Sequence, residues 1–179
     1  MYTKEQIEAA VKAKGYAWFE NGDFDVNIVG IRNSATGKAV TNVFDDWMTI
    51  SYKENGAWKS YVWACTTDPG TKAVKEFHNP NGVGRLVPNQ YRGVWKIDLH
   101  QGKYEAVTQQ KPVTVFRDKD LDDLAEETAV TETGIFGINI HKAGADSTYV
   151  ENWSEGCTVF KKSADFEEFM KNSSNSPIG

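Results

Sequence analysis

The sequence predicts a mainly β protein of the α+β class, formed by a single sheet-based domain with a helix near each terminus. Three observations lead to this prediction. The 179 residues include six Trp, seven Tyr and nine Phe, and aromatic residues favour packed β-structure over disorder. Short alternating segments recur between turns rich in Gly, Pro and Asn. Helical signals occur near the two ends, and no internal repeat divides residues 1–179.

The N-terminal helix is predicted over residues 4–14. Thr3 followed by Gln6 has the spacing of a capping box, in which each side chain hydrogen-bonds the backbone N–H of the other residue. Apolar residues then recur at helical spacing. Gly15 provides a stop, because glycine readily adopts the left-handed conformation that follows many helices. We therefore expect one short amphipathic helix before the sheet begins.

The next segments predict a strand and then a β-hairpin. Residues 24–32 alternate as a strand does, with successive side chains on opposite faces. Residues 47–53 and 58–65 are two further strand-like runs, joined around Asn55-Gly56. Asn-Gly is the dipeptide most typical of a two-residue hairpin turn, because both positions require positive φ. This hairpin is the strongest local prediction in the chain.

The remainder of the predicted core, which spans residues 24–172, consists of further strands and one helix. A long loop rich in Gly, Pro and Asn covers residues 66–84. A C-terminal helix is predicted over residues 163–172 with Ser163 as its N-cap, and a loose tail over residues 173–179. The remaining predicted strands cover residues 84–88, 92–99, 104–109, 113–118 and 134–141.

The composition argues against several classes of partner. A formal net charge of −5 without a basic block lacks the positive surface that nucleic-acid binding requires. No apolar run reaches the roughly 18 residues of a membrane segment. The N-terminus lacks the apolar stretch and cleavage site of a signal peptide, so we expect synthesis in the cytoplasm. Two cysteines without a Cys-x-x-Cys pair do not predict a disulfide scaffold.

The segment GINIHKAGADSTYVENWSEGCTVF, residues 137–160, carries the candidate chemistry. His141 stands where a strand gives way to a polar loop, and Cys157 follows 16 residues later. A thiol attacks as the thiolate, and imidazole accepts a proton near neutral pH. Gly156 permits a tight turn whose backbone N–H groups are candidates for an oxyanion hole. The residues alone leave open the alternative of a buried thiol and an unrelated surface imidazole.

This segment resembles the signature of the YkuD-type L,D-transpeptidases. In that family a strand ending in His is followed, after fourteen to seventeen residues, by Ser/Thr-His-Gly-Cys. The chain has INIHKAG and then WSEGC, at a spacing inside that range. Upstream, LVPNQYRGVWKI is similar to the family's Thr-Pro-x-Gly-x-Phe/Tyr segment leading into a strand. The resemblance covers residues 84–160, and the whole sequence also resembles proteins of bacteriophages from gut bacteria.

The resemblance implies a fold, a substrate class and roles for individual residues. It implies an L,D-transpeptidase-like β-sheet domain whose partner is a peptidoglycan stem peptide. Cys157 would attack the carbonyl before a terminal D-residue and form a thioester, with His141 as the base. The backbone N–H groups of Gly156 and Cys157 would hold the oxyanion. An amine acceptor would give a cross-link, water would give hydrolysis, and both would occur at the bacterial cell wall.

Three further residues are expected near the substrate. Ser154 is expected to hydrogen-bond within the turn before Cys157 and to lie beside the bound peptide. Tyr91 and Trp153 are expected to form walls for a peptide or a sugar. The alternative for both aromatic residues is ordinary core packing.

The chain departs from the family pattern beside both reactive residues. Glu155 replaces the family's His before Gly-Cys, and Lys142 replaces the Gly after the strand-end His. A carboxylate close to the thiol would raise the pKa of the thiol. Two alternatives therefore stay open beside the acyl-transfer enzyme. One is a non-enzymatic phage structural or wall-binding domain that keeps the fold, and the other is a thiol peptidase with a different substrate.

Neither a metal ion nor another cofactor is predicted. Asp118, Asp120 and Asp122 fit positions 1, 3 and 5 of a calcium-binding EF-hand loop, but Asp123 and Ala129 stand where that loop needs Gly and Glu. We therefore expect a solvated acidic loop. The three histidines of the chain lack zinc-ligand spacing.

Overall fold

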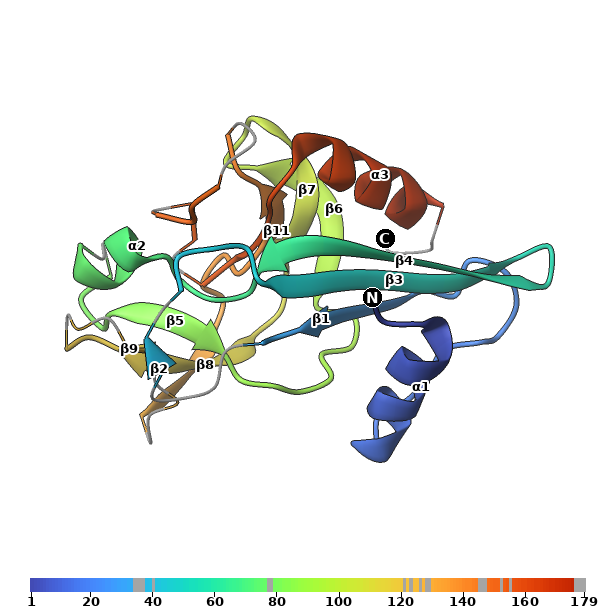
Figure 1. The fold of residues 1–179 in the computed structure, drawn as a ribbon, viewed down its shortest axis with the longest axis horizontal. Coiled ribbons are helices and arrows are strands. Elements are labelled where there is room, and N and C mark those ends of the chain that lie inside the picture. Colours follow the sequence, from blue (N-terminus) through green and yellow to red (C-terminus); the bar gives the residue numbers. More distant parts are fainter. Residues whose placement is uncertain are drawn as a thin grey trace.

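The protein is mainly β, as predicted, and its largest element is a curled sheet (Figure 1). Short helices flank this sheet, and two smaller sheets lie beside it. The computed structural model describes residues 1–33, 38–39, 41–76, 79–120, 122, 124–125, 127, 130–144, 148–151, 153–154 and 156–175.

The longest strands form a hairpin whose turn is set by two residues. β3 (Asp46–Glu54) and β4 (Ala57–Thr66) pair antiparallel, from Asp46 opposite Cys65 to Glu54 opposite Ala57. Asn55 and Gly56 join them with φ angles of 52° and 75°, in the left-handed region that this turn type requires. The predicted hairpin is therefore confirmed, together with its turn residues.

The main sheet contains seven strands in the order β1-β3-β4-β12-β11-β7-β6. β11 and β12 run parallel to each other, and the other neighbouring pairs are antiparallel. The strands outside the hairpin are β1 (Asn27–Ile31), β6 (Trp95–His100), β7 (Tyr104–Gln109), β11 (Ile140–Lys142) and β12 (Thr158–Phe160).

The central strand β12 is absent from the sequence-based predictions. It has three residues and lies between β4 on one side and β11 on the other. Val159 and Phe160 are fully buried, so this short strand crosses the middle of the core. A strand of this length has no periodicity to detect, because alternation needs at least four residues to be recognised.

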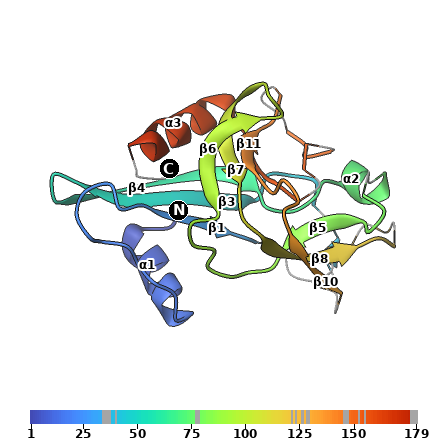
Figure 2. The ribbon, with the colours of Figure 1, turned by 180° about the vertical axis from the view of Figure 1, so that it is seen from behind.

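Two smaller sheets complete the β-structure. β5 (Val83–Leu86), β8 (Val113–Asp118) and β10 (Thr131–Gly134) form a three-stranded sheet with β8 in the middle (Figure 2). β2 (Lys38–Ala39) and β9 (Leu124–Ala125) form a two-stranded one.

The single strand predicted over residues 134–141 is wrong. β10 ends at Gly134 and belongs to the three-stranded sheet, whereas β11 begins at Ile140 in the main sheet. Between them Gly137 has a φ of 70°, a conformation that interrupts an extended strand. The break lets the chain pass from one sheet to the other.

The N-terminal helix follows its sequence signals closely. α1 (Lys4–Ala13) begins after Thr3, whose hydroxyl accepts a hydrogen bond from the Gln6 N–H at 3.2 Å. The Gln6 side chain accepts from the Thr3 N–H at 2.9 Å, which completes the predicted capping box. Gly15 has a φ of 76° just after the helix, as expected of its stop signal.

The other helices differ in detail from prediction. α3 (Ser163–Ser174) begins after Lys162, so Ser163 is its first helical residue and not its N-cap, and it extends past residue 172. Lys162 has the extended backbone of an N-cap, with φ −116° and ψ 133°, and Ser163 is already helical. α2 (Thr71–Lys75) lies inside the segment predicted as a loop. None of the helices described is both long and apolar enough to cross a membrane.

Helices α1 and α3 lie on opposite sides of the β3–β4 hairpin in both ribbon views (Figures 1 and 2). The α3 side holds the largest apolar cluster, in which Phe160 contacts Phe169 with ring centroids 5.1 Å apart. The α1 side holds a smaller cluster, in which Ile7 packs beside Trp18. Apolar side chains are therefore buried on both faces of the β3–β4 hairpin, which holds it between α1 and α3.

Phe160→Ala is expected to lower the free energy of unfolding by about 3–5 kcal/mol, because it leaves a cavity in the centre of the sheet. Urea unfolding measures this change. Leu99→Ala is the matched control, since the Leu99 side chain on β6 is 56% exposed, and it should change stability by less than about 1 kcal/mol. Similar losses in the two variants would contradict the described core.

Candidate active site

Cys157 lies directly before β12 and is partly exposed, unlike the other cysteine. Its Sγ–H donates to the Gly137 carbonyl oxygen at 3.2 Å, and the Asn139 backbone N–H donates to Sγ at 3.4 Å. Both cysteines are free thiols. Cys65 is fully buried, and burial raises the pKa of its thiol well above the ordinary value. Of the two, Cys157 is therefore the one with access to a substrate.

The parallel pairing of β11 with β12 places His141 on the same side of the sheet as Cys157. His141 is opposite Val159, and the Thr158 N–H donates to the Asn139 carbonyl at 2.9 Å, so Cys157 lies beside Asn139. Residues two apart on a strand share a face. Standard strand spacings then separate the Cα atoms of Cys157 and His141 by about 8 Å. A cysteine and a histidine side chain can span that separation.

The tautomer of His141 is set by its neighbour. Nδ1 lies 2.9 Å from the Lys142 carbonyl oxygen, which can only accept, so Nδ1 carries the proton. In the neutral ring Nε2 is then the nitrogen that can take a proton. Burial lowers the pKa of His141 from 6.5 to about 4, with a smaller lowering from His100 and an opposing effect of the Lys142 hydrogen bond. The imidazole is therefore neutral at physiological pH.

Two further residues lie beside His141, and the sequence predicted no role in catalysis for either of them. The His100 ring stacks on His141 with centroids 4.4 Å apart and planes inclined by 15°. The Tyr104 hydroxyl donates to the same Lys142 carbonyl, at 3.3 Å. Burial raises the pKa of Tyr104, its hydrogen bond to the Lys142 carbonyl opposes this effect, and negative charge on Cys157 adds to it.

The turn before Cys157 is held by Ser154, as expected. The Ser154 hydroxyl donates to the Cys157 carbonyl at 2.8 Å and accepts from the Gly156 N–H at 3.1 Å. The Gly156 N–H, one of the two groups expected in an oxyanion hole, is thus hydrogen-bonded within the turn. Glu155 lies outside the described residues.

Gly156 is the residue that this turn requires. Its φ is 136°, and a Cβ there would stand 2.3 Å from the Gly84 carbonyl oxygen and 3.2 Å from a methyl of Ile138. Strand β5 therefore passes directly against the turn. Any side chain at this position would push the turn away from β5.

Tyr91 and Trp153 occupy different environments. The Tyr91 hydroxyl donates to the Val87 carbonyl at 2.7 Å, and its ring packs edge-on against Trp95 in an apolar cluster. The Trp153 ring is 41% exposed and lies so close to Gly144 that a Cβ there would be 2.4 Å away. Of these two expected walls, Trp153 offers more surface to a ligand.

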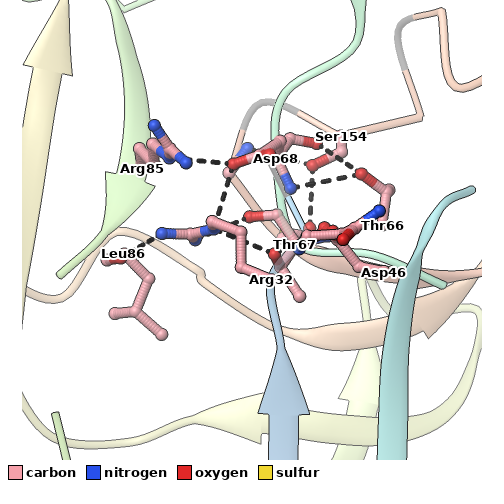
Figure 3. A network of polar contacts seen from close by, with 11 residues as sticks. Arg32, Asp46, Thr66, Thr67, Asp68, Arg85, Leu86 and Ser154 are labelled. Atoms are coloured by element: carbon pink, nitrogen blue, oxygen red, sulfur yellow. Dashed lines mark hydrogen bonds and ion pairs between the residues drawn. The ribbon is translucent and has the colours of Figure 1, made fainter. Parts of the chain in front are cut away.

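A buried ionic network holds the loop that follows β4, and this loop hydrogen-bonds the turn before Cys157. Asp68 lies between two guanidinium groups, 3.1 Å from Arg32 and 3.0 Å from Arg85 (Figure 3). Arg32 also donates to the Leu86 carbonyl at 2.9 Å and to Thr67. The sequence predicts only a turn residue at Asp68, before Pro69, and the structure shows that this carboxylate also connects the loop after β4 to β5.

A second buried carboxylate holds the same loop. Asp46 accepts hydrogen bonds from the Thr67 N–H at 2.8 Å and from the Thr67 hydroxyl at 2.7 Å. Its other oxygen accepts from the Asn33 N–H. Three residues after Thr67, the Gly70 N–H donates to the Ser154 carbonyl at 3.1 Å. The network thus extends from the hairpin to the turn that carries Cys157.

The acidic loop behaves as a set of local turns. Asp120 accepts from the Asp122 N–H at 3.2 Å, and Asp122 accepts from the Leu124 N–H at 2.7 Å. Asp123 and Ala129 lie outside the described residues. Within the described part of the chain, no group of three or more His, Cys, Asp or Glu side chains could hold a metal ion.

Gly156→Ala is expected to destabilise the protein by at least about 2 kcal/mol more than Gly102→Ala. Gly102 also has positive φ, at 69°, but no atom lies within 4 Å of an added Cβ, so it serves as a control for a positive-φ glycine without a steric neighbour. Urea unfolding of the two variants gives the difference. Equal losses would show that β5 does not press against the cysteine turn.

The buried neutral His141 also predicts a pH dependence of stability. Between pH 6.5 and about 4 the unfolded chain binds a proton on this residue and the folded protein does not, so stability falls as the pH falls. This shift corresponds to about 3 kcal/mol. In His141→Gln that part of the loss should disappear in urea unfolding measured from pH 4 to 7. An unchanged pH dependence would contradict the burial of a neutral imidazole.

No family model, curated protein or solved structure matches the chain. The likeness to L,D-transpeptidases thus stays an expectation from the sequence of residues 84–160.

Proposed function

We propose that the chain performs cysteine-dependent acyl transfer or hydrolysis on peptidoglycan stem peptides, in the manner of an L,D-transpeptidase. The observation that carries the proposal is the arrangement of one neutral imidazole and one partly exposed thiol on the same side of adjacent parallel strands. The ring nitrogen Nδ1 of His141 is held by a carbonyl, which leaves Nε2 to act as a base.

In the first step Sγ of Cys157 attacks the carbonyl carbon before the terminal D-residue, and the thiol proton moves to Nε2 of His141. The tetrahedral intermediate collapses to a thioester, and the leaving amine takes the proton from His141. An acceptor amine or a water molecule then attacks the thioester and passes its proton to Nε2. Cys157 recovers this proton as the product leaves.

The pKa of His141 determines how the first step proceeds. Because burial lowers the pKa of His141 to about 4, a separate proton transfer from a thiol to this imidazole before the attack is unfavourable. The resting pair is therefore thiol and neutral imidazole. Proton transfer accompanies the attack, when the thiol becomes more acidic as sulfur bonds to carbon.

The oxyanion requires donors near Cys157. The Gly156 N–H would have to exchange the Ser154 hydroxyl for the oxyanion, at the loss of one hydrogen bond of about 1 kcal/mol. That loss is small beside the roughly 3 kcal/mol that one oxyanion donor typically contributes. The turn is therefore compatible with the expected role of its backbone.

The substrate class comes from the resemblance of the sequence to L,D-transpeptidases, which act on stem peptides of the cell wall. A phage origin would favour hydrolysis of the host wall over cross-linking. The proposal includes both acceptors, an amine and water.

The proposal predicts that a carbapenem, which L,D-transpeptidases accept as a mimic of the stem peptide, forms a covalent adduct on Cys157. Intact-mass spectrometry should show one adduct in the wild type and none in Cys157→Ser. In His141→Gln the rate of adduct formation should fall at least tenfold. Cys65 is an internal control, because it is fully buried and should stay unmodified.

Muropeptide digestion followed by mass spectrometry then identifies the acceptor. Alkylation of Cys157 by iodoacetamide without a carbapenem adduct would favour a thiol peptidase with another substrate. If Cys157 reacts with neither reagent, the acyl-transfer proposal is wrong and the non-enzymatic wall-binding alternative takes its place.

A further inference from the structure

The stacked pair of His100 and His141 joins two strands that are not neighbours in the sheet. His100 is the last residue of β6, His141 belongs to β11, and β7 lies between these strands. Both side chains are buried, with 7% and 6% of their surface exposed. Their ring centroids are 4.4 Å apart with nearly parallel planes, so each ring limits the rotation of the other.

Hydrogen bonds give the two rings opposite tautomers. The Gln109 backbone N–H donates to Oδ1 of Asn139 at 2.9 Å, which identifies Nδ2 as the amide donor. That Nδ2 lies 3.0 Å from Nδ1 of His100, so this ring nitrogen accepts and the His100 proton is on Nε2. His141, by contrast, carries its proton on Nδ1.

Asn139 is itself held in place. Gln109 accepts hydrogen bonds from the Phe136 and Ile138 N–H groups through Oε1, at 3.2 and 2.9 Å. It donates to the Gly134 carbonyl at 2.9 Å through Nε2. This set of bonds fixes the segment that leads into β11. The orientation of His100 therefore follows from the backbone and not from solvent.

We propose that His100 is a positioning residue for the cysteine–histidine site, whose neutral ring holds His141 with Nδ1 on the Lys142 carbonyl, so that Nε2 is the nitrogen that can take a proton. This inference rests on the proposed function and adds a residue that does not touch the substrate. A protonated His100 would direct a second N–H against the Asn139 amide donor, so the ring stays uncharged.

The neutral state of His100 matters when His141 takes up the thiol proton. The resulting imidazolium then stacks on an uncharged aromatic ring, which attracts a cation, and not on a second cation. Burial lowers the pKa of His100, and the nearby Lys103 charge lowers it further. The stack therefore accommodates one imidazolium more readily than two.

The test combines a spectroscopic measurement with a kinetic one on the full chain. Long-range ¹H–¹⁵N spectra of the imidazoles at neutral pH report the tautomer of each ring, and intact-mass time courses with a carbapenem report acylation of Cys157. The variants are His100→Ala, which removes the ring, and His100→Phe, which keeps the stack without nitrogen atoms. Leu99→Ala is the control, an exposed position on the same strand.

The proposal expects the wild type, Leu99→Ala and His100→Phe to keep His141 as the Nδ1–H tautomer and to acylate within threefold of one another. His100→Ala should show mixed His141 tautomers and acylate at least tenfold more slowly. A single tautomer and unchanged acylation in His100→Ala would overturn the proposal. A folded His100→Phe variant whose acylation rate falls as far as that of His100→Ala would also overturn the proposal.

The two proposals fail in distinguishable ways. If the wild type forms no adduct, the acyl-transfer function is wrong, and the tautomer spectra alone decide the role of His100. Mixed tautomers in His100→Ala would then still support positioning, and an unchanged spectrum would overturn it. If His100→Ala does not fold, His100→Phe is compared with Leu99→Ala. Both are expected to acylate within threefold of the wild type, and a slower His100→Phe would overturn the proposal.

Discussion

The parallel pairing of β11 and β12 is the constraint on which the rest of the structure depends. Only three residues of each strand take part, yet the pair joins the β3–β4 hairpin to the β6–β7 hairpin in one sheet. Phe160 on β12 fills the centre of the core beneath α3. The same pairing brings Cys157 beside Asn139 and sets His141 on the same face. Fold and candidate chemistry thus rest on one short contact.

His141 is uncharged at rest, and burial is the reason. His141 is almost fully enclosed, so an imidazolium there loses most of its hydration, and the free energy of that loss exceeds the gain from the Lys142 hydrogen bond. Charged groups are instead gathered in the Arg32–Asp68–Arg85 network, which supports the turn from the β5 side (Figure 3). The ionic network holds the loop after β4, whereas the thiol of Cys157 and Nδ1 of His141 hydrogen-bond backbone groups.

Local signals predicted the local structure well. The capping box at Thr3 and the turn at Asn55-Gly56 each specify an element by contacts within a few residues, and both are present. β12 escaped prediction because three residues show no periodicity, and the strand expected over 134–141 failed because Gly137 breaks it. In both cases long-range pairing determines the outcome.

The candidate site shows the same difference between features set by local sequence and features set by long-range contacts. Spacing in the sequence singled out Cys157 and His141, and the turn role of Ser154 followed from its chemistry. His100 and Tyr104 carried no such signal, since they reach His141 only through the folding of the β6–β7 hairpin against β11. Asp68 looked like a turn residue before Pro69, because its partners Arg32 and Arg85 are distant in sequence.

The central claim is that Cys157 and His141 act together as nucleophile and base. The most direct test is the rate of Cys157 alkylation by iodoacetamide from pH 3 to 10, in the wild type and in His141→Gln. The account predicts a plateau of His141-dependent reactivity that begins above the His141 pKa of about 4 and extends through neutral pH. A rate that rises tenfold per pH unit up to the ordinary thiol pKa, identically in both proteins, would contradict the account.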